Sequence, residues 1–292
     1  MLKKSWATLL VLLAFSLNLY ADNHKDKDQG HNEDKSDFPH AKLELNLLKK
    51  KHYAPMPVEL DASKSMAKKG NTLVMYEFDF GDGSAKKIVN TPIIKHTFEI
   101  LGETFLDSLK FWNKKSDEKS FTITLRVQDN NGTWSAPKTK KIELKQIPDP
   151  GKKGKETLAG IDEDEDGVRD DVQLYIASQF NNDTPVVREA LRQHAIMVQK
   201  NLLSANNKEQ SIIDSYAMMK SAGCLRYLKI GYGFMDIGGD KDYSSKISNF
   251  MFNTKARILA EILADKNFSG QVWKLPSEEE EAHQCNFNES DL

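Results

Sequence analysis

The chain has 292 residues, of which 39% are hydrophobic, and its formal net charge at pH 7 is −2. This length and hydrophobic content suit two domains of ordinary size, each with its own core. The near balance of charge argues against nucleic acid as a partner, because nucleic-acid binding calls for clustered lysine and arginine.

The first 21 residues have the pattern of a secretory signal peptide. Lys3 and Lys4 form a positive start, an apolar run follows from Trp6 to Leu17, and Ala21 offers a small residue for cleavage. The run is short for a membrane anchor, which is the alternative. No later segment approaches about 18 consecutive apolar residues, so we expect no transmembrane segment in the exported chain, whether it is periplasmic or extracellular.

Residues 22–40 are charged and polar, and Phe38 is the only aromatic side chain among them. Such a composition cannot bury enough apolar surface to offset the entropy of the chain, so we expect a disordered tether. Its histidines could bind a transition metal, but a solvated spacer is the simpler interpretation.

From residue 41 to 146, apolar side chains alternate with polar ones in short runs separated by turn residues. The clearest runs are Leu43, Leu45 and Leu47, then Tyr76, Phe78 and Phe80, and then Phe121, Ile123, Leu125 and Val127. A period of two places each run on one face of a strand, and a series of such strands predicts an antiparallel β-sandwich.

Four sequence blocks follow one another in this region: VELDASKS from Val58, YEFDFGDGS from Tyr76, HTF from His96 and ITLRVQDNNG from Ile123. Together they resemble PKD domains, the immunoglobulin-like family named after polycystic kidney disease. Phe78 stands where these domains usually have tryptophan, and residues 103–120 form an insertion. The resemblance implies an immunoglobulin-like sandwich that serves as a spacer or as a binding module for protein or polysaccharide.

Several polar and aromatic residues of this region lie outside its apolar faces. Asp79 and Asp82 are interpreted as turn-stabilising carboxylates, with a cation contact as the alternative, and His96 as a hydrogen-bonded strand histidine. Trp112 and Trp134 have polar neighbours in the sequence. They could form an exposed stacking platform for a ligand, or at least one of them could cap the edge of the sandwich.

A cluster of proline and glycine, QIPDPGKKGK at 146–155, predicts a linker over residues 147–159. Beyond it the apolar period changes to 3.6, which predicts a mainly α-helical domain over 174–292 with an acidic C-terminal tail. The run from Glu278 to Glu281 in this tail is expected to be solvated.

Four helices are expected in this domain. The first carries Val172, Ile176 and Phe180, and the second begins with Thr184 as N-cap and Pro185 as its first residue. The second has an apolar stripe of Val187, Leu191, Ala195, Val198 and Leu202. The third runs from Ile212 to Leu228, and the fourth runs from Ile247 to Leu263 with Phe250, Ala256 and Leu259 on its apolar face.

Between the linker and the helices, residues 160–173 form an aspartate-rich loop with D-x-D-x-D-G spacing. It is similar to the loops of thrombospondin type 3 repeats, dockerins and EF-hands. The resemblance implies one Ca²⁺ bound by the side chains of Asp162, Asp164 and Asp166, the carbonyl of Val168, and Asp170 directly or through water.

Gln173 stands where an EF-hand has a bidentate glutamate, so the loop is no complete EF-hand. The alternative interpretation is an acidic helix N-terminus that is favoured by the helix dipole. So many acidic side chains would repel one another without a counter-ion, which favours calcium. Similar runs followed by an amphipathic helical domain occur in exported bacterial proteins.

Cys224 and Cys285 are the only cysteines. In an oxidising compartment an even pair predicts one disulfide, and two buried thiols are the alternative.

We expect an exported, non-catalytic, calcium-binding interaction or scaffold protein that meets a protein or polysaccharide at the cell envelope. No metalloprotease, nucleophile-elbow, phosphate-loop or dinucleotide motif is present, and no organic cofactor is expected. The alternative is a periplasmic or secreted enzyme with an active site in the helical domain, where only His194 and His283 could act as bases. In a third hypothesis, calcium orders the junction between the two domains.

Overall fold

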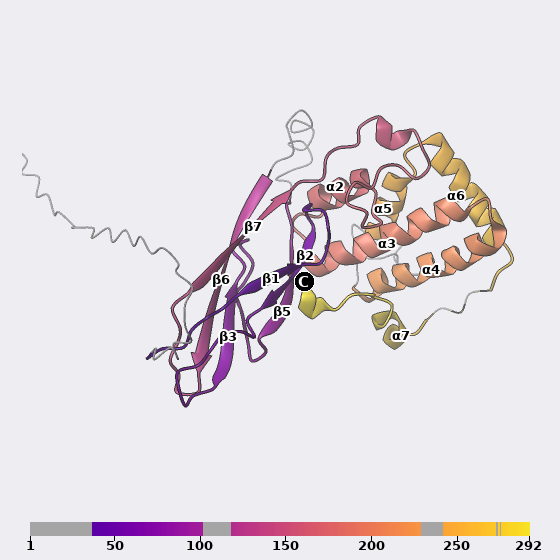
Figure 1. The fold of residues 1–292 in the computed structure, drawn as a ribbon. Helices are drawn as coiled ribbons and strands as arrows, with labels where there is room; N and C mark the ends of the chain where they lie inside the picture. Colours follow the sequence, from indigo (N-terminus) through magenta and orange to yellow (C-terminus); the bar gives the residue numbers. More distant parts are fainter. Residues whose placement is uncertain (1–36, 102–117, 229–241, 273, 275) are drawn as a thin grey trace, which may run out of the picture. The chain divides into compact units, whose positions relative to one another are not determined.

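A computed structural model describes residues 37–101, 118–228, 242–272, 274 and 276–292 (Figure 1). The predicted signal peptide, nearly all of the predicted tether, most of the insertion at 103–120 and Trp112 lie outside the described residues. The residues from Ser36 to Leu292 belong to one compact unit.

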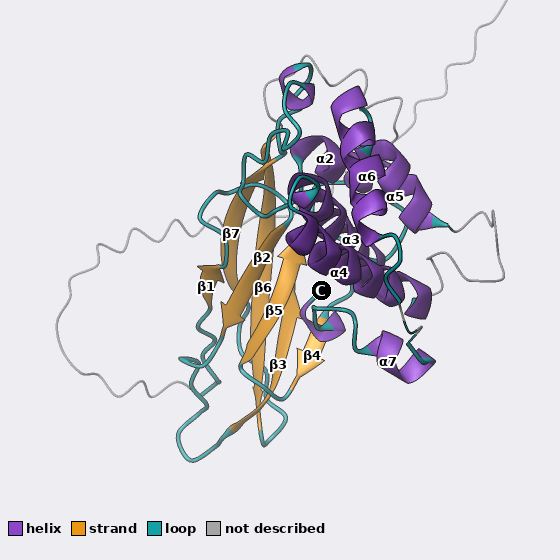
Figure 2. Cartoon of the chain, turned by 90° about the vertical axis from the view of Figure 1, so that its right-hand side faces the viewer, coloured by secondary structure: helices purple, strands orange, loops and turns teal. Residues whose placement is uncertain are grey.

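Seven β-strands precede the helices in the described part of the chain. They are β1 (Glu44–Leu47), β2 (Met56–Asp61), β3 (Leu73–Asp79), β4 (Lys87–Val89), β5 (Ile93–Phe98), β6 (Glu118–Asp129) and β7 (Lys138–Lys145). The strands form two sheets with the orders β1-β2-β5 and β4-β3-β6-β7, and every pairing is antiparallel (Figure 2). The predicted antiparallel sandwich is confirmed.

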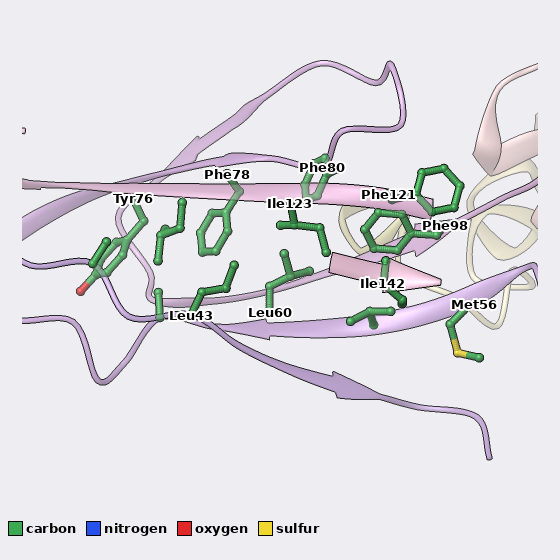
Figure 3. Close-up of a cluster of buried hydrophobic side chains, with 14 of the residues drawn as sticks. Leu43, Met56, Leu60, Tyr76, Phe78, Phe80, Phe98, Phe121, Ile123 and Ile142 are labelled. Carbon is green, nitrogen blue, oxygen red and sulfur yellow. The ribbon is translucent and has the colours of Figure 1, made fainter. Parts of the chain in front are cut away.

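The core of the sandwich consists of the side chains that the period of two places inward. Tyr76, Phe78 and Phe80 are 8%, 0% and 1% exposed. They meet aliphatic and aromatic side chains of both sheets, among them Leu43, Met56, Leu60, Phe98, Phe121, Ile123 and Ile142 (Figure 3). Burial of this apolar surface is the main stabilising term of the sandwich.

The turn after β3 is held by its own carboxylates. Gly81 has φ of +70°, and a Cβ there would lie 2.2 Å from the carbonyl oxygen of Thr122, so only glycine fits. Asp79 accepts a hydrogen bond from the Gly81 N–H, and Asp82 accepts one from the Ser84 N–H. These bonds are the turn-stabilising contacts expected of the two aspartates.

His96 is buried on β5 beside this turn. Its Nε2 lies 2.6 Å from Asp82 Oδ2, and its ring stacks on Phe80 with the ring centres 3.7 Å apart. Burial opposes ionisation of Asp82, but its bonds to His96 and Ser84 hold the pKa of this carboxyl well below its usual range. His96 therefore ties the turn to the core.

Six α-helices follow in the described residues. They are α2 (Asp170–Gln179), α3 (Pro185–Ser204), α4 (Lys208–Tyr227), α5 (Tyr243–Met251), α6 (Lys255–Phe268) and α7 (Glu278–Ala282), with short 3₁₀ helices η1 (Lys153–Lys155) and η2 (Glu289–Asp291). The helical region after the sandwich is thereby confirmed. No helix in this part of the chain is long and apolar enough to span a membrane.

The second predicted helix begins where its sequence signal places it. The Thr184 side chain accepts a hydrogen bond from the Val187 N–H, and Pro185 is the first residue of α3. Along its stripe, Leu191, Ala195, Val198 and Leu202 are buried.

The single helix expected over residues 247–263 is wrong. The chain forms α5 and α6 instead, because Thr254 caps a new helix by accepting a hydrogen bond from the Arg257 N–H. The predicted apolar face is also wrong at Ala256 and Leu259, which are exposed. The inward face of α6 consists of Arg257, Ala260 and Ala264.

The expectation of a purely solvated acidic run is wrong at Glu281. This carboxylate accepts a hydrogen bond from Arg226 Nε at 2.7 Å, and its side chain is 14% exposed. The Glu280 side chain closes a capping box with Ser277 at the start of α7.

Two contacts join the sandwich to the first helices. Glu99, just after β5, accepts hydrogen bonds from Arg188 Nε at 2.8 Å and from the guanidinium of Arg192. Gln173 Nε2 donates to the carbonyl of Ala54 at 2.9 Å. The Gln173 contact is buried and the Glu99 contacts are partly buried. The predicted aspartate-rich loop, residues 160–173, runs into the first residues of α2.

Candidate metal site at the aspartate-rich loop

The loop before α2 folds around its own aspartates. Asp162 accepts hydrogen bonds from the N–H groups of Asp166 and Gly167, at 3.1 and 2.9 Å. Asp166 accepts one from the Val168 N–H at 2.8 Å. Glu165 and Gly167 have φ of 60° and 90°, in the left-handed region that lets the chain reverse direction. The hydrogen bonds and the reversal of the chain bring the side chains of Asp162, Asp164 and Asp166 close together.

Three carboxylates converge in this loop. One oxygen each from Asp162, Asp164 and Asp166 lies within 4.8 Å of the others. The side chain of Asp164 is fully buried, and its Oδ1 has no hydrogen-bond partner among the described residues. A buried carboxylate oxygen without a partner is costly, and a cation would supply the missing interaction. The donor set consists only of oxygen, so the three aspartates could hold a hard metal ion.

The other two predicted ligands lie beside this cluster. Val168 and Asp170 are buried, and Asp170 Oδ1 accepts a hydrogen bond from the Glu163 N–H at 2.8 Å. Burial, together with the negative charges of Asp164 and Asp162, raises the pKa of Asp170 to about 7. Their role as ligands stays a prediction.

Gln173, at the last position of the loop, is turned partly toward the sandwich. Its Nε2 donates to Ala54, as described above, and its Oε1 is buried without a partner in the described part of the chain. The residue is 2% exposed. Gln173 therefore links the loop to the sandwich by its amide nitrogen and leaves one neutral oxygen unused.

Two of the three aspartates are bound by a lysine that the sequence pattern did not indicate. Lys49, in the connection between β1 and β2, places Nζ 3.0 Å from Asp164 Oδ2 and 2.8 Å from Asp166 Oδ2. Nearby, the Lys51 ammonium lies 3.2 Å from Glu165 Oε1 and bonds the carbonyl of Glu163. Both lysines precede the loop by more than 100 positions, and no spacing rule in the sequence brings them together with it.

A buried arginine network supports the loop from the other side. Arg169 forms a bidentate pair with Asp171, with distances of 2.8 and 2.9 Å. Asn253 also donates to Asp171. Burial opposes the charged form, but the pairing with Arg169 lowers the pKa of Asp171.

Arg257 extends this network to the predicted linker. Its guanidinium, which is fully buried, donates to the carbonyls of Gly154, Thr157 and Leu158 at 2.7, 3.1 and 3.3 Å. Segment 154–158 is thereby fixed to α6. Gly160 lets the backbone pass close to the side chain of Arg169, since a Cβ at this position would lie 2.8 Å from Arg169 Cδ.

The remaining candidate residues lie away from this site. Cys224 and Cys285 form the predicted disulfide, which joins α4 to the segment after α7. His194 is buried, and its Nδ1 lies within hydrogen-bond distance of Ser221 Oγ, at 2.9 Å. Burial lowers the pKa of His194 to about 4. His283 is exposed, and its Nδ1 lies 2.8 Å from the carbonyl of Glu279.

Trp134 is half-buried at the end of β6. Its backbone forms an isolated antiparallel β-bridge with Gln128. The guanidinium of Arg126 lies 4.9 Å from the centre of the indole ring. One face of the indole is thus covered by an arginine of the same chain. The two-tryptophan platform stays a prediction, because Trp112 lies outside the described residues.

Comparison with known proteins gives likenesses to solved structures alone. No family model matches the chain, and no curated protein matches it. The chain is similar to the PKD1 domain of Vibrio anguillarum Epp, with 18% identity and a TM-score of 0.24 over 37% of this chain and 93% of that chain. It is similar to the PKD1 domain of the Vibrio cholerae metalloprotease PrtV, with 19% identity and a TM-score of 0.24 over 37% of this chain and 96% of that chain.

A third likeness is to a structure described as showing the promiscuous specificity of carbohydrate-binding modules from the β-sandwich superfamily. The identity is 21% and the TM-score 0.26, over 39% of this chain and 36% of that chain. The two-sheet architecture itself is established by the strand pairing.

Proposed function

We propose that this chain is an exported, non-catalytic interaction protein that binds calcium at the aspartate-rich loop. In this proposal Asp162, Asp164 and Asp166 ligate the ion by their side chains, Val168 by its carbonyl, and Asp170 directly or through water. The sandwich serves as a spacer or as a binding module for a protein or polysaccharide at the cell envelope.

The convergence of the three aspartates carries this proposal. Three carboxylate oxygens lie within 4.8 Å of one another, and Asp164 adds a buried oxygen without a partner among the described residues. Calcium takes six to eight oxygen ligands in flexible geometry, whereas magnesium demands a compact octahedron and gives up its water reluctantly. An all-oxygen set of five proposed protein ligands therefore suits calcium better than magnesium, which is usually bound by one or two carboxylates and keeps several waters.

The expected affinity is modest. Gln173 offers at most one neutral oxygen where a strong site has a bidentate carboxylate, so we expect a dissociation constant on the order of 10⁻⁵ to 10⁻³ M. Such an affinity suits an exported protein, because extracellular modules bind calcium in the weaker part of this range.

The chemistry of the helical region supports a non-catalytic role. His194, one of the two candidate bases of the alternative function, is buried and bonded to Ser221 Oγ, which donates to the carbonyl of Met218. A base in this position does not face a solvent-borne substrate, and its lowered pKa follows from burial alone.

Calorimetric titration of the purified chain with calcium and with magnesium tests the calcium site. We expect saturable calcium binding, its loss in Asp164→Ala, and no change in Glu209→Gln, an exposed carboxylate on α4. Calcium should also raise the melting temperature relative to chelator, since the ion favours the folded loop. An absence of binding heat at millimolar calcium, with equal melting curves, would leave only the acidic helix N-terminus.

A pull-down from envelope extract and from insoluble polysaccharide, with calcium or chelator, tests the interaction role. We expect a retained protein or polysaccharide that does not bind a chain with a destabilised sandwich, such as Phe80→Ala. Hydrolysis of a generic ester, peptide or glycoside by the purified protein would instead support the enzyme alternative.

A further inference from the structure

The connection between β1 and β2 lies directly against the proposed calcium ligands. Lys49 Nζ is 3.0 Å from Asp164 Oδ2 and 2.8 Å from Asp166 Oδ2, and the lysine side chain is only 18% exposed. The ammonium is thus a cation supplied by the sandwich, bound to two of the three carboxylates that converge in the loop. Its position shows independently that this point of the loop accepts positive charge.

A calcium ion and the Lys49 ammonium compete for the same carboxylates. Calcium binds oxygen at about 2.3–2.6 Å, so an ion held by Asp162, Asp164 and Asp166 lies close to the Oδ2 atoms that the ammonium now contacts, even where it uses the unpartnered Oδ1 of Asp164. Two cations between the same carboxylates would also repel each other strongly. The lysine has a flexible four-carbon stem, so its ammonium can move to solvent while the backbone of residue 49 stays in place.

We propose that Lys49 is a tethered counter-ion that calcium displaces, so that calcium binding breaks the Lys49 contact between the β1–β2 connection and the loop. The inference rests on the proposed calcium site and adds that the Lys49 ammonium competes with calcium for it. In the calcium-free chain the lysine neutralises Asp164 and Asp166 and holds the connection against the loop. In the calcium-bound chain the ion takes these carboxylates, and the lysine becomes available to solvent.

The release is local, because the other contacts between the two regions do not involve the displaced carboxylates. Gln173 donates to the carbonyl of Ala54, and Glu99 accepts from Arg188 and Arg192. These contacts keep the sandwich and the helices together in both states. Lys51 keeps its contacts with Glu163 and Glu165, and the Leu48 N–H donates to the carbonyl of Pro57 at 3.0 Å, so the change is confined to the side chain of Lys49.

Two matched lysine variants test the exchange by calcium titration of the full chain. Lys49→Met keeps the apolar stem and removes the charge, and Lys50→Met does the same at a neighbouring exposed lysine. We expect Lys49→Met to bind calcium about tenfold more tightly than wild type, within the 5- to 150-fold range typical of coupled sites. Lys50→Met should bind like wild type.

Zero-length carbodiimide cross-linking of the wild-type chain gives a second readout that needs no variant. A Lys49–Asp164 or Lys49–Asp166 cross-link, identified by peptide mass spectrometry, should form in chelator and be suppressed at saturating calcium. A cross-link that calcium leaves unchanged, or that fails to form in chelator, would overturn the exchange.

The two proposals fail in different ways. Equal calcium affinity in wild type and Lys49→Met would overturn the exchange and leave the calcium site intact. An absence of calcium binding in both chains would overturn the calcium site, and the exchange with it.

Discussion

The sandwich and the helical region have interiors of different chemistry. Among the described residues, the buried side chains of the sandwich are apolar except for His96, Asp129 and Ser135. The helical region buries four arginines, Arg169, Arg188, Arg192 and Arg257, together with further polar side chains. Apolar patterning therefore specifies the first interior almost completely, whereas the second depends on hydrogen bonds between distant segments.

The arginines of the helical region act as connectors. Arg257 joins α6 to segment 154–158, and Arg188 joins α3 to Glu99 of the sandwich. Arginine suits this role because its planar group offers five donors that can satisfy several acceptors at once. The helical region is therefore assembled around loops whose carbonyls need hydrogen-bond donors, and an apolar period of 3.6 in the sequence does not reveal this need.

The largest expected effect lies in the apolar interior. Phe80→Ala should lower the free energy of unfolding by about 3–5 kcal/mol, because it empties a buried site in contact with His96 and Phe98. Urea denaturation of the full chain measures the change. Ile88→Ala, at a position that is 55% exposed on β4, is the control and should change stability by about 0.5 kcal/mol or less. Similar midpoints for the two variants would contradict the assignment of faces.

The polar interior predicts a smaller but still large effect for Arg257→Met. Removing the guanidinium leaves the carbonyls of Gly154, Thr157 and Leu158 without their donor, at a cost on the order of 3 kcal/mol. Hydrogen exchange of residues 152–160 should accelerate in the variant. Lys255→Met, exposed on the same helix, should leave both stability and exchange unchanged. A stabilised Arg257→Met chain would show that this interior tolerates apolar packing as the sandwich does.

His194 predicts a pH dependence of the helical region. Its pKa in the folded chain is about 4, below its ordinary value of 6.5, so the unfolded chain binds a proton at a pH where the folded chain does not. Above pH 6.5 the neutral imidazole does not lower the free energy of unfolding. As the pH falls toward 4, protonation of the unfolded chain lowers this free energy, on the order of 2 kcal/mol by pH 5.

Comparison of wild type with His194→Gln isolates the contribution of this imidazole, because carboxyl groups elsewhere in the chain also titrate in this range. Unfolding free energies measured at pH 7.5 and pH 5.0 should converge between the two proteins as the pH falls. A difference that is the same at both pH values would contradict the assignment.

The smallest expected effect is at Leu259, where the periodic pattern is misleading. Leu259 is 55% exposed on α6, so Leu259→Ser should change stability by about 0.5 kcal/mol or less. Ala264, which is fully buried on the same helix, is the contrasting position, and Ala264→Leu should cost about 1–3 kcal/mol by overpacking. Thermal unfolding of both variants measures the difference, and a large loss in Leu259→Ser would restore the predicted apolar face.

Sequence patterning was informative where the structure depends on neighbouring residues. The alternation of Tyr76, Phe78 and Phe80 follows from the period of a strand. The start of α3 at Thr184 and the turn of the aspartate-rich loop are set by hydrogen bonds between residues at most five positions apart. The disulfide was predicted from the number of cysteines and the expected compartment. The apolar face predicted for the fourth helix is wrong because Arg257 occupies an inward position, and hydrophobic periodicity assigns such positions to apolar residues.

By itself, the sequence determined the period-two faces, the helix caps and the convergence of Asp162, Asp164 and Asp166, because local backbone geometry and short-range hydrogen bonds specify them. Only the tertiary structure decided that Lys49 meets Asp164 across 115 positions and that Arg257 meets Gly154 across 103. Long polar side chains have many possible partners in the unfolded chain. Burial selects one partner, because an unpaired charge away from water is costly, and burial exists only once the chain has folded.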